Sequence, residues 1–120
     1  MQSNIQKNDS ANQYDVIVLG AGAAGLMAAI TAASRNRSVL VVEKSNKIGK
    51  KILMSGGGKC NFTNTSIEFD NFISQNPHFC KSALSRYTAF DFIKLVEKHA
   101  IEYEERKDHQ MFCVHSSKDI

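Results

Sequence analysis

Two short runs of apolar residues, rich in β-branched side chains, flank an alanine-rich segment near the start of the chain. The run YDVIVLG predicts a buried strand over residues 14–19, and SVLVVEK predicts a second one over residues 38–43. The segment between them predicts a helix over about residues 23–35, with Asn36 as its left-handed C-cap. Strand, helix and strand in so short a stretch predict one right-handed βαβ unit with parallel strands.

The pattern beyond residue 43 is less regular. Residues 44–76 are predicted to be mostly irregular, and a loop of that length inside a compact domain is often functional. Pro77 suits the first turn of a helix that would continue through HFCKSALSRY. The segments IEYEER and MFCVH predict two strands around the polar turn KDHQ, and SSKDI resembles the start of a helix.

Residues 88–100 predict a better-defined helix. Thr88 and Asp91 have the spacing of a capping box, in which each side chain bonds the backbone N–H group of the other residue. Four residues are expected to share the apolar face of this helix: Phe92, Leu95, Val96 and His99.

Composition narrows the class of protein. With 120 residues, 42% hydrophobic and 22% charged, the chain matches one small globular domain. The formal charge of +3 suits an anionic ligand such as a nucleotide, whereas the scattered basic residues disfavour nucleic-acid binding. Residues 1–13 are polar and predict a flexible tail without a secretory leader, and no apolar run approaches a membrane span. These features favour a cytoplasmic protein.

The cysteines and histidines indicate packing more than chemistry. Cys60, Cys80 and Cys113 form no CxxC pair, and an odd number of cysteines favours a reducing compartment. A thiolate beside a lysine would be reactive, but Cys60 has no second cysteine next to it in sequence, so we favour a packing role. Cys80 and Cys113 are expected in the core. The four histidines lack metal-ligand spacing, so no metal site is predicted.

The motif with the clearest chemistry is GAGAAG, a full GxGxxG at Gly20, Gly22 and Gly25. It follows a predicted strand and opens a predicted helix, which is the context of a dinucleotide-binding site. Gly20 permits a tight turn, Gly22 lets the backbone approach a diphosphate, and Gly25 lets helix and strand pack closely. The N–H groups near Ala23 and Ala24 then face the diphosphate with the helix dipole behind them.

A carboxylate stands where such sites bind ribose. Glu43 lies 18 residues beyond Gly25, at the end of the second predicted strand, and can accept hydrogen bonds from ribose hydroxyls. It would repel a 2′-phosphate, which disfavours NADP. Lys44 is placed either beside the adenine or in solvent. The fingerprint itself serves both NAD and FAD.

The stretch SGGGKCNFTN, residues 55–64, contains three successive glycines followed by Lys59. It does not match a Walker loop, because Leu53 occupies the position of the first glycine and Cys60 follows the lysine. Taken alone it is compatible with a phosphate loop, a redox site or a linker. Asn61 and Asn64 can hold such a loop through side-chain-to-backbone hydrogen bonds.

Two stretches together resemble the amino-terminal part of a known family. DVIVLGAGAAGLMAA and VVEKSNKIGKKILMSGGGKCNFTN, with the spacing between them, are similar to the aminoacetone oxidase/BaiN-like family of bacterial FAD-dependent flavoproteins. The second stretch is far more specific than the dinucleotide fingerprint. Near the end of the chain the resemblance weakens. His109 and Gln110 stand where the family tends to carry glycine and arginine, and Val114 and His115 stand where it carries an aromatic residue and proline.

The resemblance implies an α/β fold in which the βαβ unit is part of an incomplete Rossmann-like FAD-binding domain over residues 14–120. It implies a flavin-dependent oxidoreductase, in which hydride passes between FAD and a small-molecule substrate or a nicotinamide nucleotide. It assigns cofactor contacts to the following residues: Gly20, Gly22, Ala23, Ala24, Gly25, Glu43, Lys44, Lys51, Gly57, Gly58, Cys60 and Asn61.

Family members are several hundred residues long, so we expect this chain to be an amino-terminal fragment that is inactive alone, with the catalytic residues elsewhere. Two alternatives stay open. One is an NAD-binding enzyme domain, which leaves the triple glycine unexplained. The other is a non-catalytic remnant that pairs its open sheet edge with another chain.

Overall fold

A computed structural model describes residues 13–120, and the tail predicted over residues 1–13 therefore lies outside the described residues except for its last position. The chain divides after Gly49 into two compact units. The first unit contains the predicted βαβ motif, and the second begins at Lys50. Each unit is described by itself.

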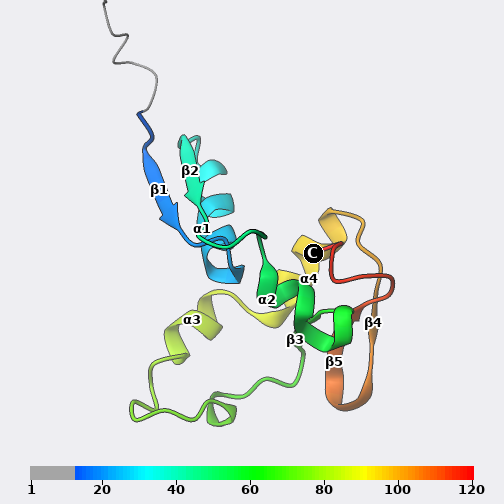
Figure 1. Cartoon of the computed structure of the whole chain (residues 1–120). Coiled ribbons are helices and arrows are strands. Elements are labelled where there is room, and N and C mark those ends of the chain that lie inside the picture. Colours follow the sequence, from blue (N-terminus) through cyan, green and yellow to red (C-terminus); the bar gives the residue numbers. More distant parts are fainter. Residues whose placement is uncertain (1–12) are drawn as a thin grey trace, which may run out of the picture. The chain divides into compact units, whose positions relative to one another are not determined.

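The first unit is a parallel strand pair with one helix (Figure 1). β1 is Val16–Leu19, α1 is Ala23–Ala33 and β2 is Val39–Val42. The two strands run parallel in continuous register, from Val16 opposite Val39 to Leu19 opposite Val42. The predicted βαβ unit is confirmed, and each element is shorter than predicted by one or two residues at its ends. Asn36 has a φ of 58°, which confirms the predicted left-handed position after the helix.

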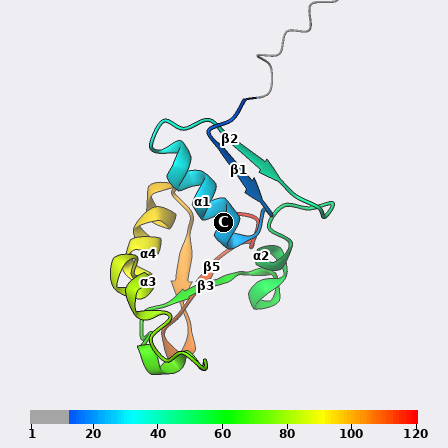
Figure 2. The same cartoon turned by 90° about the vertical axis from the view of Figure 1, so that its left-hand side faces the viewer.

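The prediction that both strands are buried is wrong for one face of the pair. Figure 2 shows α1 lying along the strands, and it packs on both of them. Successive side chains of a strand point to opposite faces, so one helix covers only every second residue. Ile17 is 58% exposed and Leu19 is 81% exposed, whereas Val16 and Val18 are partly buried. An apolar strand sequence thus predicts that both faces of the strand pair are buried, but within this unit α1 covers only one face.

The second unit is built around an antiparallel sheet with the strand order β3-β5-β4. The strands are β3 Asn61–Asn64, β4 Tyr103–Glu105 and β5 Gln110–Cys113, and the α-helices are α2 Lys50–Met54, α3 Lys81–Arg86 and α4 Ala89–Lys98. Short 3-10 helices occur at Ser55–Gly58, Phe69–Asn71 and Lys107–His109. The predicted strands around KDHQ are confirmed as the β4–β5 pair.

The prediction that residues 44–76 are mostly irregular is wrong in part. They contain α2, two 3-10 helices and β3, and β3 pairs with β5 in antiparallel orientation. NFTN has no strand-like alternation of its own. It becomes a strand because its backbone groups find hydrogen-bond partners in β5, nearly 50 residues further along the chain.

Helix α4 begins where the capping box predicts. The Thr88 side chain accepts a hydrogen bond from the Asp91 N–H group at 3.2 Å, and the Asp91 carboxylate accepts one from the Thr88 N–H group at 2.9 Å. Val96 is 2% exposed and Ile93 is also buried, so the buried face is centred between them. His99 is the exposed C-cap of the helix and does not belong to the buried face, contrary to the prediction.

The core of the second unit lies between α4 and the sheet. Phe62 of β3 has its ring centre 5.7 Å from that of Phe92 and 5.9 Å from that of Tyr103. Three successive residues of β5 are also buried: Met111, Phe112 and Cys113. Aromatic contacts of this kind join elements from three separate parts of the sequence, and they hold β3 in the sheet.

One helix prediction needs correction. The helix predicted from Pro77 begins only at Lys81, because residues 77–80 form a turn in which the Asn76 side chain accepts a hydrogen bond from the His78 N–H group at 3.0 Å. At SSKDI the backbone forms a turn with the side-chain contacts of a helix start: Asp119 accepts from the Ser116 N–H group and Ser116 Oγ accepts from the Lys118 N–H group, each at 3.1 Å. In residues 13–120 no helix is long and apolar enough to cross a membrane.

Candidate functional site

The first glycine-rich turn, Gly20–Gly25, joins β1 to α1. Gly20 has a φ of 98°, a region that favours glycine, and its N–H group donates to the Val42 carbonyl at 2.7 Å. A Cβ atom at Gly25 would lie 1.9 Å from the Gly20 carbonyl oxygen and 3.2 Å from Val18 Cγ1. Both observations agree with the predicted roles, a tight turn at Gly20 and close helix–strand packing at Gly25.

The amino end of α1 is open. Gly22 is its N-cap, with a φ of −83°, and no side chain of the described residues caps the helix there. The N–H groups of the first helical turn have no acceptor inside a helix, and the helix dipole places partial positive charge beside them. A Cβ atom at Gly22 would meet no atom of residues 13–120 within 4 Å. Ala23 and Ala24 are both exposed, so the backbone here is accessible to an anionic group.

Glu43 lies against this turn, immediately after β2. Its Oε2 atom accepts a hydrogen bond from the Ala21 N–H group at 2.7 Å, and its Oε1 atom accepts one from the Ser45 N–H group at 2.7 Å. These bonds to Ser45 and Ala21 hold the pKa of the Glu43 carboxyl below its usual range. The predicted nearness of Glu43 to the turn is confirmed, whereas its contact with ribose stays a prediction. Lys44 is exposed beside it.

The second glycine-rich segment, residues 55–60, is named the triple-glycine turn below. Gly56, Gly57 and Gly58 have φ values of 55°, 63° and 86°, so all three occupy the left-handed region. A Cβ atom at Gly56 would lie 2.7 Å from both the Asn61 nitrogen and Phe112 Cε1, whereas at Gly57 and Gly58 it would meet no described atom within 4 Å. Gly56 is therefore required for packing, and Gly57 and Gly58 present accessible backbone.

Side chains from distant segments hold the triple-glycine turn. Lys59 Nζ donates hydrogen bonds to the carbonyl oxygens of Val114 and His115, each at 2.7 Å. Ser117 is buried, its Oγ atom donates to the Leu53 carbonyl at 2.8 Å and its N–H group donates to the Gly58 carbonyl at 2.8 Å. Lys59 thus has a structural function, and sequence reasoning assigned no such role to Ser117. No local sequence signal identifies a bond between residues more than 50 positions apart.

The buried thiols favour packing over redox chemistry. Cys60 is 4% exposed, and the register that pairs Asn61 with Phe112 places Cys60 beside Cys113, which is fully buried. All three cysteines are free, and Cys80 is also buried. Burial, with a smaller contribution from Cys60, raises the pKa of the Cys113 thiol to about 11. The packing roles predicted for the cysteines are confirmed, although the neighbour of Cys60 was not foreseen.

The predicted site residues fall into two groups, one in each unit. The first group surrounds the open end of α1: Gly20, Gly22, Ala23, Ala24, Gly25, Glu43 and Lys44. The second lies on or near the triple-glycine turn: Lys51, Gly57, Gly58, Cys60 and Asn61. In this second group Lys51 and Asn61 are exposed, and Cys60 is buried. Among residues 13–120, no three His, Cys, Asp or Glu side chains are grouped so that they could hold a metal ion.

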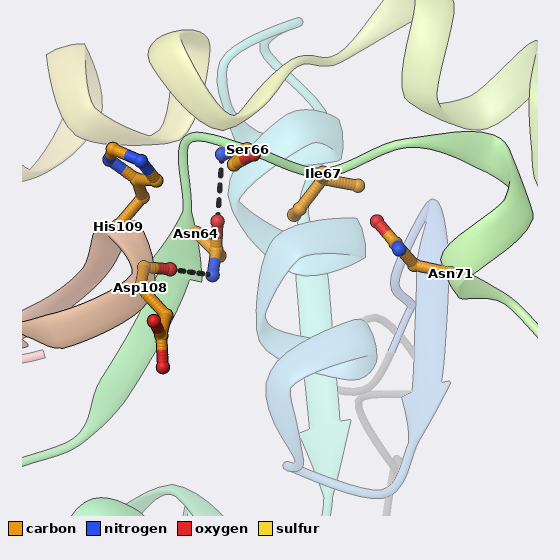
Figure 3. A pocket seen from close by; sticks show the side chains of 6 residues that line it. All are labelled: Asn64, Ser66, Ile67, Asn71, Asp108 and His109. Carbon is orange, nitrogen blue, oxygen red and sulfur yellow. Dashed lines mark hydrogen bonds between the residues drawn. The ribbon is translucent and has the colours of Figure 1, made fainter.

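A further pocket lies in the second unit (Figure 3). It has a volume of about 630 Å³ and is lined by Asn64, Ser66, Ile67, Asn71, Asp108 and His109. The Asn64 side chain connects the segments on the two sides of the pocket. Its Oδ1 atom accepts a hydrogen bond from the Ser66 N–H group at 2.7 Å, and its Nδ2 atom donates one to the Asp108 carbonyl at 2.8 Å. Asn64 makes side-chain-to-backbone bonds as predicted, but they hold the end of β3 to the turn at Asp108 and not the glycine-rich stretch, and the pocket itself was not predicted.

Comparison with known proteins gives a consistent result. Residues 14–120 match the HI0933-like protein Rossmann domain. The chain is 51% identical over 108 residues to the ribosomal RNA dihydrouridine synthase of Escherichia coli (strain K12), covering 90% of this chain and 27% of that protein. It is 52% identical over 110 residues to the protein of the same name from Haemophilus influenzae, covering 91% and 27%.

A third relative has a different activity in its name. The chain is 36% identical over 72 residues to the 3-dehydro-bile acid delta(4,6)-reductase of Clostridium scindens, covering 58% of this chain and 18% of that protein. The matches to the two ribosomal RNA dihydrouridine synthases each cover 27% of the relative, so the chain spans about a quarter of their length.

Proposed function

Because this chain belongs to the HI0933-like Rossmann domain family, we propose that it forms the FAD-binding part of a flavin-dependent oxidoreductase. The observation that carries the proposal is the open amino end of α1 behind Gly22, with the Glu43 carboxylate beside the same turn. This arrangement provides N–H donors for a diphosphate and an acceptor for ribose hydroxyls. The resemblance of the triple-glycine stretch to flavoproteins favours FAD over NAD.

The residues of the first unit fit the adenosine diphosphate half of the cofactor. The N–H groups of Gly22, Ala23 and Ala24 would donate to diphosphate oxygens, because they lack helical acceptors. Glu43 would accept from ribose hydroxyls with the lone pairs that its two backbone bonds leave free. Its negative charge disfavours a 2′-phosphate, and Lys44 would lie near the adenine.

The family resemblance assigns the triple-glycine turn to the flavin end of the cofactor. A Cβ atom at Gly57 or Gly58 would meet no described atom within 4 Å, so a planar ring can approach that side of their backbone closely. Lys51 and Asn61 would supply an ammonium and an amide near that ring, and Cys60 would contribute through its backbone. Bound FAD would supply the hydride-transfer chemistry. We assign no catalytic residue to the chain.

For the whole protein, the relatives suggest a reduction reaction. The names of the two relatives at 51% and 52% identity specify ribosomal RNA and dihydrouridine, so we propose a uridine in ribosomal RNA as substrate. This differs from the small-molecule substrate that the family resemblance implied and from the lack of nucleic-acid binding expected from composition. A nicotinamide nucleotide is the proposed electron donor, and the proposed location is the cytoplasm.

The direct test measures binding of FAD to the 120-residue chain. We expect FAD to raise the melting temperature, and NAD to raise it less at the same concentration. Circular dichroism of the ligand-free chain provides the control for folding. A folded chain that binds NAD and not FAD would favour the NAD-binding alternative. A folded chain that responds to neither would refute the proposal and favour a non-catalytic remnant.

A further inference from the structure

Two carboxylates hold the parallel strand pair at its opposite ends. At the amino ends, Asp15 Oδ2 accepts hydrogen bonds from the Ser38 N–H group at 2.8 Å and from Ser38 Oγ at 2.9 Å. At the carboxyl ends, Glu43 accepts from Ala21 and Ser45. Four residues of strand separate the two ends, a distance of about 13 Å. Asp15 accepts both bonds with one oxygen, whereas Glu43 uses both of its oxygens, and only the Glu43 contact involves the glycine-rich turn.

Ala21 is the residue through which Glu43 acts. It lies between Gly20 and Gly22 and is 1% exposed. Its N–H group donates to Glu43, and its carbonyl accepts from the Gly49 N–H group at 2.8 Å. The preceding N–H group, that of Gly20, donates to the Val42 carbonyl. Hydrogen bonds to Val42, Glu43 and Gly49 thus fix the peptide groups that lead into Gly22.

We propose that Glu43 is a positioning residue, which holds the glycine-rich turn in its ligand-binding conformation before a ligand arrives. This role is additional to its ribose contact and rests on the proposed dinucleotide function of the turn. Without the carboxylate, the Ala21 N–H group is a buried donor with no acceptor, and the turn must shift to satisfy it. A shift at Ala21 moves the N–H groups of Gly22 and Ala23 away from a shared anion. Preorganised donors bind an anion without the cost of ordering them.

Glutamine cannot replace glutamate in this contact. Both carboxylate oxygens accept hydrogen bonds from backbone N–H groups, at 2.7 Å each. A glutamine side chain has one oxygen and one NH₂ group, so it would place a donor against a donor at Ala21 or at Ser45. Because the single glutamine oxygen can stay on Ala21, the variant that removes both contacts is Glu43→Ala.

The first experiment uses the ligand-free chain. Amide hydrogen exchange measured by NMR should show that the Ala21 N–H group is protected in the wild type, whereas those of Ala23 and Ala24 exchange rapidly. Glu43→Ala should speed exchange at Ala21 at least tenfold. Rapid exchange at Ala21 in the folded wild-type chain would overturn the proposal without any variant, which covers the case in which Glu43→Ala does not fold.

The second experiment uses inorganic pyrophosphate, which carries no ribose, and follows the amide shifts of Ala23 and Ala24. Removing the negative charge of Glu43 should strengthen anion binding if electrostatics alone operated. The positioning role predicts the opposite sign, at least a fivefold weaker affinity in Glu43→Ala. The matched control, Asp15→Ala, removes the carboxylate at the other end of the strands and should keep the affinity within twofold.

The outcomes separate this inference from the proposed function. If Glu43→Ala weakens FAD binding but leaves Ala21 exchange and pyrophosphate affinity unchanged, Glu43 acts only on ribose and the positioning role is refuted. An equal loss of pyrophosphate affinity in Asp15→Ala would also refute it, because the effect would then be general destabilisation. If the wild type binds neither pyrophosphate nor FAD, the proposed function fails, while the exchange measurement still tests the contact between Glu43 and Ala21.

Discussion

Replacing Gly25 with alanine tests how closely α1 must approach the turn after β1. The added Cβ atom would lie 1.9 Å from the Gly20 carbonyl oxygen, more than 1 Å inside the 3.0 Å that such contacts hardly ever violate. The Cβ position is fixed by the helix backbone and its partner is a backbone carbonyl, so no rotation of a side chain can relieve the contact. The helix itself must move, and Val18 Cγ1 at 3.2 Å restricts that movement.

The expected magnitude follows from two opposing effects. Overpacking of this kind costs about 1–3 kcal/mol and sometimes more. Alanine in a helix is favoured over glycine by about 1 kcal/mol, which offsets part of the cost. Because the overlap is large and lies between backbone atoms, we expect the overpacking to exceed its usual range and the free energy of unfolding to fall by about 2–3 kcal/mol.

The assay combines urea unfolding, followed by circular dichroism, with hydrogen exchange in β1, α1 and β2. Gly22→Ala is the matched control, because its Cβ atom would meet no described atom within 4 Å and its φ is −83°. We expect Gly22→Ala to leave stability unchanged or to raise it by up to about 1 kcal/mol, since alanine restricts the unfolded chain. The same variant should lose FAD affinity at least tenfold, because its methyl group lies where the diphosphate approaches.

Two results would refute this reasoning. A Gly25→Ala chain as stable as the wild type, with unchanged hydrogen exchange in α1, would mean that the helix can move away from the turn at no cost. A Gly22→Ala chain that is less stable than Gly25→Ala would mean that the space around Gly22 is not open in the ligand-free protein.

Three further predictions concern the second unit. Gly56→Ala should lower the free energy of unfolding by about 2 kcal/mol or more, because its Cβ atom would collide with Phe112 and its φ is positive. Gly57→Ala should lower it by only about 1–2 kcal/mol through backbone strain, and urea unfolding distinguishes the two variants. Lys59→Met should lower the free energy of unfolding by about 1–2 kcal/mol in the same assay, because it removes two hydrogen bonds to carbonyl groups. An equal decrease in a variant of an exposed lysine, Lys98→Met, would contradict this. Cys113 should resist iodoacetamide at pH 8 until the chain unfolds, and rapid labelling of the folded chain, detected by mass spectrometry, would argue against burial of the thiol. The free energy of unfolding should fall as pH rises from 9 to 11, because the thiol ionises first in the unfolded chain while its pKa in the folded chain is about 11.

Part of the fold could be predicted from the sequence because its causes are local. The βαβ unit follows from two apolar β-branched runs around an alanine-rich segment, and the glycine spacing identifies the turn between them. The start of α4 follows from Thr88 and Asp91, which lie three residues apart and satisfy each other. The β4–β5 pair is a hairpin between neighbouring segments. In each case the residues that interact are close in sequence, so their pattern contains the information.

The remainder was decided by tertiary contacts between distant residues. NFTN became β3 only because β5 offers its backbone hydrogen-bond partners, and β1 is exposed on one face because α1 covers only the other. Glu43 was predicted to bind ribose from its position after β2, but its bond to the Ala21 N–H group depends on how two strand ends meet in space. Lys59 could be read as a ligand contact or a solvated charge, and the structure instead places its ammonium group against two carbonyl groups of the segment after β5. A backbone group buried by folding must find a partner wherever the fold supplies one, and no local pattern of polar and apolar residues specifies which distant residue that will be.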